Sequence, residues 1–390
     1  MKLKQDPDDF RVEELTGIQP GSDGPFALYR LEKRNWTTHD AISAIRRSWQ
    51  LHAQRVAYGG LKDRHAATVQ YLSIFRGPHR NFQQPGFQLT WLGQIREPYS
   101  SRAVDANRFE ITLRDLDADR ASAACERAPV LSRDGAPNYF DDQRFGSVGA
   151  DRDFIARRMV RGEFETALKL ALAAPYEFDR AAAKKEKAIL LENWGRWAEC
   201  KDLLPCGHAR SLIDYLKHHP TDFRGAVGRL RPDLQGLYLS AYQSFLWNAI
   251  LGGWLSERML ADNLISLNLR LGSFPAPRSF DDASREHWRG AVLPLPAARW
   301  RFDPSAEWSS IAERVLADEG FTWEQLKIRG LQKPFFTKGE RAAWSFPADF
   351  AAERFPDERN AGRFALRLKF SLPRGSYATI IVKRLMAGLQ

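Results

Sequence analysis

The sequence has few of the features that mark exported or membrane-spanning proteins. Its three cysteines, Cys125, Cys200 and Cys206, are an odd number without framework spacing, which predicts no disulfide and favours a reducing compartment. No stretch approaches the roughly 18 consecutive apolar residues of a membrane span. The first residues lack the apolar segment of a signal peptide. We therefore expect a cytoplasmic protein without a membrane partner.

Metal ligands are also sparse. Cys200, Cys206 and His208 follow the pattern Cys-x5-Cys-x-His, which matches no usual structural zinc spacing. We expect no metal site and no cofactor, and no feature of the sequence implies a protein partner.

What the sequence does have is length, positive charge and aromatic side chains. A chain of 390 residues exceeds the size at which one hydrophobic core usually stops growing, so two domains are expected. The formal net charge of +10 and the pI near 9.5 point to an anionic partner. With 24 Phe, 12 Trp and 10 Tyr beside many arginines, the composition suits single-stranded or flipped nucleotides better than a membrane surface.

The first part of the chain reads as mixed α and β structure. Alternating apolar and polar residues predict strands, and a change to helical spacing after Thr37 or Thr38 predicts a helix that one of these residues caps. The pattern favours an antiparallel or mixed sheet with helices packed on it. The expected strands cover residues 9–14, 26–31, 55–58, 69–75 and 109–113.

Beyond Gly149 the spacing of apolar residues becomes helical, as far as about residue 249. The proline-rich residues 272–304 predict an extended connection, and residues 364–370 alternate strictly, as a strand does. Ser376 is expected to cap a final short helix. The fold class is therefore α+β, with a mixed or antiparallel sheet built from both termini, residues 1–150 and 341–390, and a mainly helical domain, residues 151–340, inserted between them.

The loop Gly59-Gly60-Leu61-Lys62-Asp63-Arg64 places one carboxylate between two cations. Lys62 and Arg64 favour the ionised form of Asp63 and can also hold phosphate, an arrangement that suits a nucleophile. The alternative is a solvated β-turn with a charged tip.

Two further stretches carry groups that suit a nucleotide. In residues 137–146, Asn138 can bond a base or sugar edge and Phe140 can stack on a base, although a capped loop with two buried aromatics is an equal alternative. In residues 372–379, Tyr377 lies near a helix start where it can meet a ligand, although Pro-x-Gly-Ser before a helix is also ordinary cap chemistry.

Together these stretches resemble the TruD family of pseudouridine synthases. The matching pieces are residues 9–14, Gly60 to Ala66 with Thr68 and Gln70, Asn138 to Phe140 with Gln143 to Gly146, and Leu372-Pro373 with Gly375 to Thr379. The resemblance implies a pseudouridine synthase core with an inserted TRUD-type domain, Asp63 as catalytic nucleophile, and a substrate pocket containing Phe10, Asn138, Phe140, Tyr377 and, six residues before Phe10, Lys4. Lys62 and Arg64 are added from the charge pattern of their loop.

The sequence departs from the family pattern at two places. Family members usually have glycine where Asp141 stands, so the local turn is expected to differ or an extra carboxylate to face the RNA. Residues 151–340 match mainly around Leu239 to Asn248, which leaves the choice of RNA open.

The implied reaction is the isomerisation of a uridine in transfer RNA, with uridine 13 as the expected target. A single carboxylate can attack C1′ or remove a sugar proton, and the residues do not distinguish these routes. A glycoside hydrolase is an alternative in which Asp63 pairs with Asp141 or Asp142. A basic RNA-binding protein without turnover is another.

Overall fold

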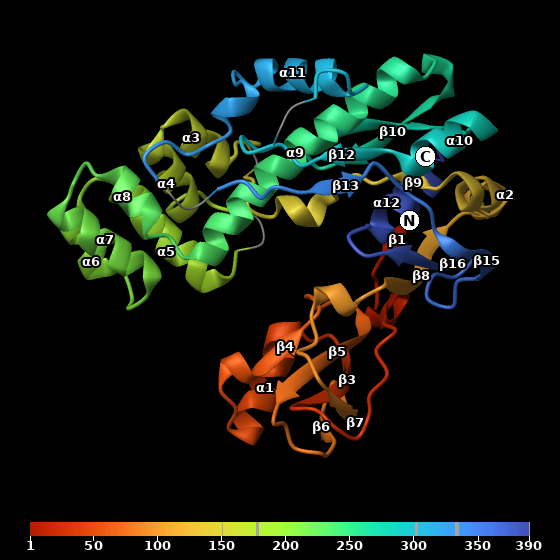
Figure 1. Ribbon diagram of the computed structural model, residues 1–390, viewed down its shortest axis with the longest axis horizontal. Coiled ribbons are helices and arrows are strands. Elements are labelled where there is room, and N and C mark those ends of the chain that lie inside the picture. The colour runs from red at the N-terminus through yellow and green to blue at the C-terminus, as the bar shows by residue number, and fades with distance from the viewer. Residues whose placement is uncertain (150, 177–178, 301–302, 332–334, 390) are drawn as a thin grey trace. The chain divides into compact units, whose positions relative to one another are not determined.

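The structure is a computed structural model that describes residues 1–149, 151–176, 179–300, 303–331 and 335–389. Its chain divides into two compact units, each visible in Figure 1. Unit 1 comprises Met1–Ala136 and Ser345–Gln390, and unit 2 comprises Pro137–Trp344. Residues 137–150, which the sequence pattern groups with the first part of the core, thus lie in unit 2.

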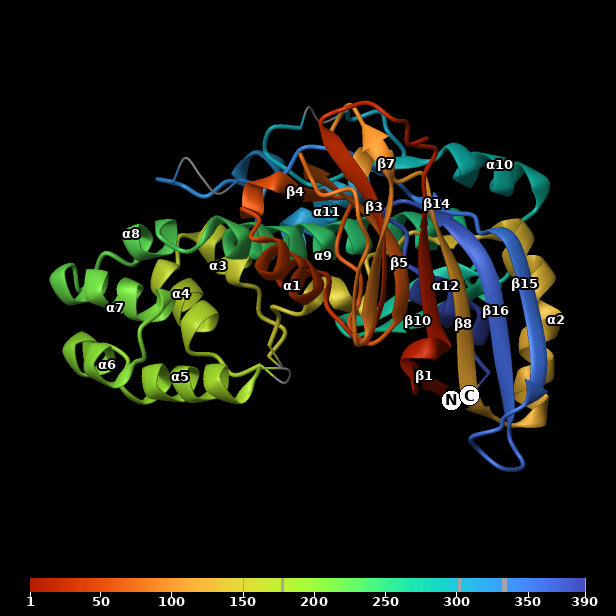
Figure 2. The same cartoon turned by 90° about the horizontal axis from the view of Figure 1, so that it is seen from below.

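Unit 1 is built on a mixed sheet that contains ten strands within the described residues. Eight of them follow one another in the order β15-β16-β8-β2-β5-β3-β7-β6, and β1 and β4 lie off this path, paired with β8 and β5. The pair β2 and β5 is parallel, over three residue pairs, whereas the neighbouring pairs are antiparallel. Figure 2 shows β8, β16 and β15 side by side. The strands are β1 Lys2–Leu3, β2 Phe10–Leu15, β3 Phe26–Arg34, β4 Val56–Tyr58, β5 Ala67–Phe75, β6 Phe82–Gln84, β7 Phe87–Ile95, β8 Ala106–Leu116, β15 Ala348–Pro356 and β16 Phe364–Pro373.

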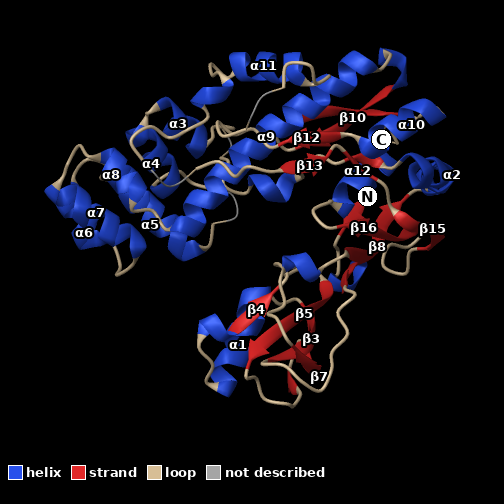
Figure 3. Cartoon of the chain, in the orientation of Figure 1, coloured by secondary structure: helices blue, strands red, loops and turns tan. Residues whose placement is uncertain are grey.

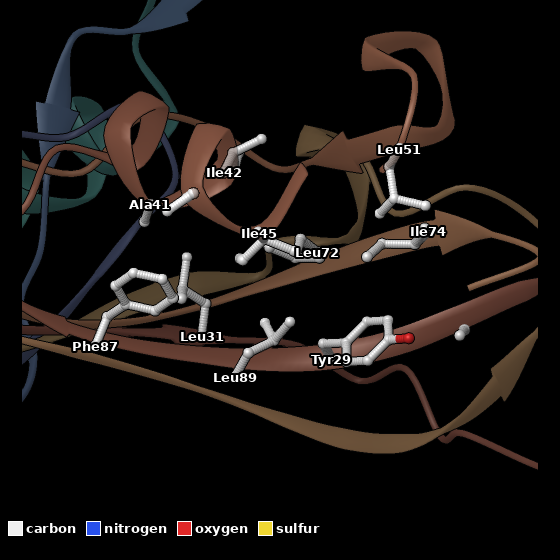
Figure 4. Close-up of a cluster of buried hydrophobic side chains, with 12 residues drawn as sticks. Tyr29, Leu31, Ala41, Ile42, Ile45, Leu51, Leu72, Ile74, Phe87 and Leu89 are labelled. Atoms are coloured by element: carbon white, nitrogen blue, oxygen red, sulfur yellow. The ribbon is translucent and has the colours of Figure 1, made fainter. Parts of the chain in front are cut away.

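The helices of unit 1 are α1 Thr38–Trp49, α2 Ala118–Asp134 and α12 Ala378–Met386. The Thr37 side chain caps α1 by accepting a hydrogen bond from the backbone N–H of Asp40, as the sequence pattern predicts. The buried face of α1 contributes Ala41, Ile42 and Ile45 to a core with β3, β5 and β7 (Figure 4). This core fixes α1 against the strands that carry the Asp63 loop.

The last helix begins one residue later than expected. Its N-cap is Tyr377, with extended backbone angles, and Ser376 lies outside the helix. The prediction that Ser376 caps this helix was therefore wrong, because the extended conformation continues through Tyr377.

Unit 2 is mainly helical (Figure 3). Its longest helix is the 27-residue α9, which carries buried Tyr242, Trp247 and Leu251. The helices are α3 Ile155–Arg161, α4 Phe164–Leu172, α5 Ala181–Glu192, α6 Trp197–Leu203, α7 His208–His218, α8 Phe223–Gly228, α9 Pro232–Arg258, α10 Asp282–Gly290 and α11 Ser309–Asp318. The strands are β10 Leu264–Leu269, β11 Gly272–Pro277, β12 Val292–Pro294 and β13 Glu340–Ala342, and β9 Ala136–Pro137 and β14 Trp344–Ser345 lie where the chain passes from one unit to the other.

Residues 272–304 were wrongly predicted to be an extended connection. They contain β11, α10 and β12, and β11 pairs with β10 in a two-stranded sheet. Pro275 and Pro277 are tolerated in β11 because each strand of a two-stranded sheet has an edge that needs no ladder hydrogen bonds. The α+β class and the mixed sheet are confirmed by the observed elements.

No helix among the described residues is both long enough and apolar enough to cross a membrane.

Candidate active site

Asp63 lies on the loop of residues 59–66, which joins β4 to β5 in unit 1. The loop begins close to the body of the unit: a Cβ atom at Gly59 would lie 2.7 Å from a methyl carbon of Val104. Glycine at this position therefore permits an approach that any other residue would prevent. The Asp63 side chain remains partly accessible, with 34% of its surface exposed.

Two buried polar side chains hold the backbone before Asp63. The hydroxyl of Thr38, in α1, accepts a hydrogen bond from the Lys62 backbone N–H at 3.0 Å and donates one to the Gln70 amide oxygen at 2.8 Å. The Gln70 amide nitrogen, in β5, donates to the Gly60 carbonyl at 3.1 Å. Thr38 and Gln70 are 1% and 0% exposed, so these bonds are shielded from water.

A buried lysine lies beneath the same loop. Lys33, at the end of β3, is 3% exposed and donates hydrogen bonds to the carbonyls of Trp36 at 2.8 Å, Lys62 at 3.3 Å and Asp63 at 2.9 Å. Burial lowers the pKa of Lys33 from 10.5 to about 8; the nearby charge of Asp63 opposes this shift, and that of Lys62 adds to it. The pattern Tyr29, Leu31, Lys33 places this lysine on the core-facing side of β3, which was the available signal in the sequence.

Lys4, directly after β1, contacts both Asp63 and Phe10. The Lys4 ammonium lies 2.5 Å from an Asp63 carboxylate oxygen and 4.0 Å from the centre of the Phe10 ring. The Lys4 carbonyl lies 2.8 Å from the His65 ring nitrogen Nε2, so the loop is tied to this segment at a second point. Phe10 itself is 5% exposed. Three of the residues expected in the site, Lys4, Phe10 and Asp63, are thus brought together.

The Lys62 side chain contacts two polar groups of unit 1. Its ammonium lies 3.0 Å from a Glu14 carboxylate oxygen and donates to the Asn107 amide oxygen at 2.6 Å. Glu14 also accepts hydrogen bonds from the Tyr71 backbone N–H and the Tyr99 hydroxyl. These contacts give Lys62 a part in holding the loop, and its contact with substrate stays a prediction.

Arg64 and Tyr377 are the remaining site residues of unit 1. Arg64 is exposed and lines a surface depression of about 410 Å³ with Trp36, Asp40 and Arg47. Tyr377 is half-buried at the start of α12. The roles expected of both stay predictions.

Asn138 and Phe140 belong to unit 2, where Arg341 connects them. The Arg341 guanidinium donates to the Asn138 backbone carbonyl at 2.8 and 3.0 Å and to its side-chain oxygen at 2.7 Å. It also lies 4.1 Å from the centre of the Phe140 ring, which meets Trp247 edge to face. Both Asn138 and Phe140 are 6% exposed. Arg341 was missed, because it lies about 200 residues away in the sequence.

The two acidic residues after Phe140 have structural contacts. Asp141 is 3% exposed and precedes a single 3-10 turn, residues 142–145. Asp142 accepts a hydrogen bond from the Arg270 backbone N–H at 2.8 Å. Among the described residues, no group of three or more His, Cys, Asp or Glu side chains is arranged to hold a metal ion.

Comparison with known proteins places this protein among the pseudouridine synthases, which are isomerases. More narrowly, the chain belongs to the family described as tRNA pseudouridine synthase D (TruD), whose model matches residues 1–385. The resemblance carried by the sequence motifs is thereby confirmed.

Similar proteins match over nearly their whole lengths. The chain is 32% identical to the "Probable tRNA pseudouridine synthase D 1" of Methanococcus maripaludis, covering 98% of this chain and 99% of the relative. It is 27% identical to the tRNA pseudouridine synthase D of Leptospira interrogans, covering 98% and 95%. The crystal structure of a Methanosarcina mazei protein assigned to TruD matches with a TM-score of 0.72 at 25% identity, covering 98% of this chain and 93% of the other.

Proposed function

We propose that this protein converts uridine 13 of transfer RNA to pseudouridine, with Asp63 as the catalytic nucleophile. The observation that carries the proposal is the Asp63 loop: its backbone is held by buried groups, and its carboxylate contacts the Lys4 ammonium at 2.5 Å. A carboxylate held in one position in this way suits attack on a sugar carbon.

The reaction breaks the N1–C1′ bond of the uridine, turns the uracil and forms a C5–C1′ bond. The proton at C5 is lost and N1 gains one, so the product has the same mass and no electrons are exchanged. Asp63 acts either by attack on C1′, with later displacement by C5, or by removal of a sugar proton. In either route the ionised form is required, and the positive charge of Lys4 favours it.

The target base must leave the RNA stack before Asp63 can reach its sugar. We propose that Phe10, Asn138, Phe140 and Tyr377 bind the flipped nucleotide and that Arg64 contacts the RNA backbone. We further propose that residues 1–150 and 341–390 carry the reaction while residues 151–340 select the RNA. Exchange of residues 151–340 for those of a relative would then change which RNA is modified while the reaction still depends on Asp63.

A transfer RNA substrate is consistent with a cytoplasmic protein, which we also propose. Because the isomerisation involves neither redox change nor phosphate transfer, we expect it to proceed in the presence of a metal chelator.

The test is incubation of the full chain with a transfer RNA transcript that carries uridine 13, followed by chemical derivatisation that marks pseudouridine. Asp63→Asn keeps the size of the side chain and removes its charge, so we expect at least about a thousandfold loss of single-turnover rate, or roughly 4 kcal/mol of barrier. The matched control is Asp23→Asn, an exposed aspartate of the same unit that pairs with Arg96.

Three results would contradict the proposal in different ways. Release of free uracil would indicate a hydrolase, and retention of RNA without product would indicate a binding protein. An Asp63→Asn variant within tenfold of the parental rate would remove Asp63 from the mechanism.

A further inference from the structure

Lys33 is a buried lysine whose ammonium binds backbone carbonyls. Its three hydrogen-bond partners are backbone carbonyls, those of Trp36, Lys62 and Asp63, at 2.8, 3.3 and 2.9 Å. A lysine ammonium has three donors, so these contacts use all of them when the group is protonated. Two of the carbonyls belong to consecutive residues, and the second belongs to the nucleophile itself.

Together with the contacts of Thr38 and Lys4, these hydrogen bonds hold the backbone and the carboxylate of Asp63. The Thr38 hydroxyl holds the backbone N–H of Lys62, Lys33 holds the carbonyls of Lys62 and Asp63, and Lys4 holds the carboxylate. Both peptide groups that flank the Asp63 α-carbon are therefore tied to β3, and the peptide group before them is tied to α1. Reacting groups lose rate steeply when misplaced by about 1 Å, so a fixed backbone at this point bears directly on the reaction.

Holding these three carbonyls requires a hydrogen-bond donor, which an apolar side chain of similar size does not supply. Lys33 is 3% exposed on the core-facing side of β3, where a methionine would fill much of the same space without a charge. Burial disfavours its charged form and lowers its pKa to about 8. Burial thus disfavours the ammonium, and its hydrogen bonds to the Trp36, Lys62 and Asp63 carbonyls oppose that cost.

We propose that Lys33 is a positioning residue for the pseudouridine reaction, which fixes the Asp63 backbone through the carbonyls of Lys62 and Asp63. This inference rests on the proposed role of Asp63 as nucleophile. Lys33 acts through Asp63 and does not contact the substrate.

The main variant is Lys33→Met, which removes all three donors and keeps a long side chain. If Lys33→Met does not fold, Lys33→Gln is measured in its place, because its neutral side chain keeps an amide donor. The matched control is Lys369→Met in the same unit, because the Lys369 side chain is 56% exposed on the sheet. Each protein is measured for single-turnover rate with excess enzyme, for transfer RNA affinity, and for hydrogen exchange of the peptide covering residues 59–66.

The expected result is a rate lower by about 100-fold for Lys33→Met, with affinity within about threefold of the parent, since phosphate contacts supply most of the affinity. Hydrogen exchange of residues 59–66 should become faster. The control should match the parent in exchange and rate. An unchanged rate, or unchanged exchange of the loop, would overturn the proposal.

The pH dependence of the single-turnover rate distinguishes loss of the Lys33 charge from general destabilisation of the protein. The charged groups that act on Lys33 are Asp63 and Lys62. Lys33 is protonated below about pH 8 and loses its charge and one donor above it, so the parental rate should decline as the pH rises through about 8. Lys33→Met should lack this decline, and a variant that retained it would contradict the assignment.

Failure of the proposed function gives a separate result. If the parent makes no pseudouridine, the assigned reaction is wrong, and hydrogen exchange alone then decides whether Lys33 orders the loop.

Discussion

The Lys62 ammonium lies 3.0 Å from a carboxylate oxygen of Glu14, whose side chain is 1% exposed. Removing one partner of a buried ion pair leaves an uncompensated charge and costs about 3–5 kcal/mol. We therefore expect Lys62→Met to lower the free energy of unfolding in urea by about this amount. The double variant Glu14→Gln with Lys62→Met should recover part of the loss, and a Lys62→Met variant as stable as the parent would show that the pair contributes little.

Lys4 should affect the rate more than binding. Its ammonium makes a charge-assisted hydrogen bond to Asp63 at 2.5 Å, and such bonds are worth about 1.5–3 kcal/mol. We expect Lys4→Met to lower the single-turnover rate by about 10- to 100-fold. Lys2→Met is the control, because the Lys2 side chain is 50% exposed on the same segment. Equal rates for the two variants would count against a role for Lys4.

In unit 2, lysine should not replace Arg341. The guanidinium reaches both oxygens of Asn138 and the face of Phe140 at once, whereas one ammonium cannot reproduce this fork. We expect Arg341→Lys to lower the free energy of unfolding by about 1–3 kcal/mol and to slow the reaction. Arg314→Lys, at an arginine whose side chain is 56% exposed, provides the control. An Arg341→Lys variant with the stability and rate of the parent would show that the forked hydrogen bonds to Asn138 are dispensable.

Asp357 should contribute to acid sensitivity. Burial tends to raise its pKa, but hydrogen bonds from the backbone N–H groups of Asp115 and Arg359 and from the side chains of Asn360 and Arg114 lower it to about 2. A lowered carboxyl pKa stabilises the folded state above the ordinary value of about 4, and this contribution disappears as the pH falls from about 4 toward 2.

The difference in unfolding free energy between the parent and Asp357→Asn should therefore reach about 2 kcal/mol near neutral pH and shrink as the pH falls below about 4. Denaturation in urea at pH 7, 4 and 3 measures it. A difference that stays constant across this range would mean that the charge of Asp357 is not the source of the effect.

Binding of transfer RNA should depend strongly on salt. With a formal net charge of +10, the protein is expected to neutralise several phosphates and release their counterions. The affinity should fall at least tenfold between about 50 and 200 mM salt. A flat profile would contradict an electrostatic basis for binding.

The local parts of the structure were predictable because their causes are local. The Thr37 cap and the alternation through Phe10 are visible in short windows of sequence, and they gave the right elements. The family motif likewise pointed to Asp63. Two supports of the site were not predictable in this way: Glu14 and Lys33 reach the loop from other strands, across 29 to 48 positions of sequence. No periodic pattern records such contacts, which arise only when the sheet has formed.

The strand order of the sheet also has a consequence for the time course of synthesis. β16 pairs with β8 along nine positions, yet about 250 residues separate the end of β8 at Leu116 from the start of β16 at Phe364. At about 5–20 residues per second, a ribosome needs roughly 12–50 s to cover that interval. During it, β8 presents an unpaired edge of the kind that recruits other chains. The nascent protein is thus most vulnerable to aggregation while its inserted unit is being translated, and a chaperone that shields this edge would act in that interval.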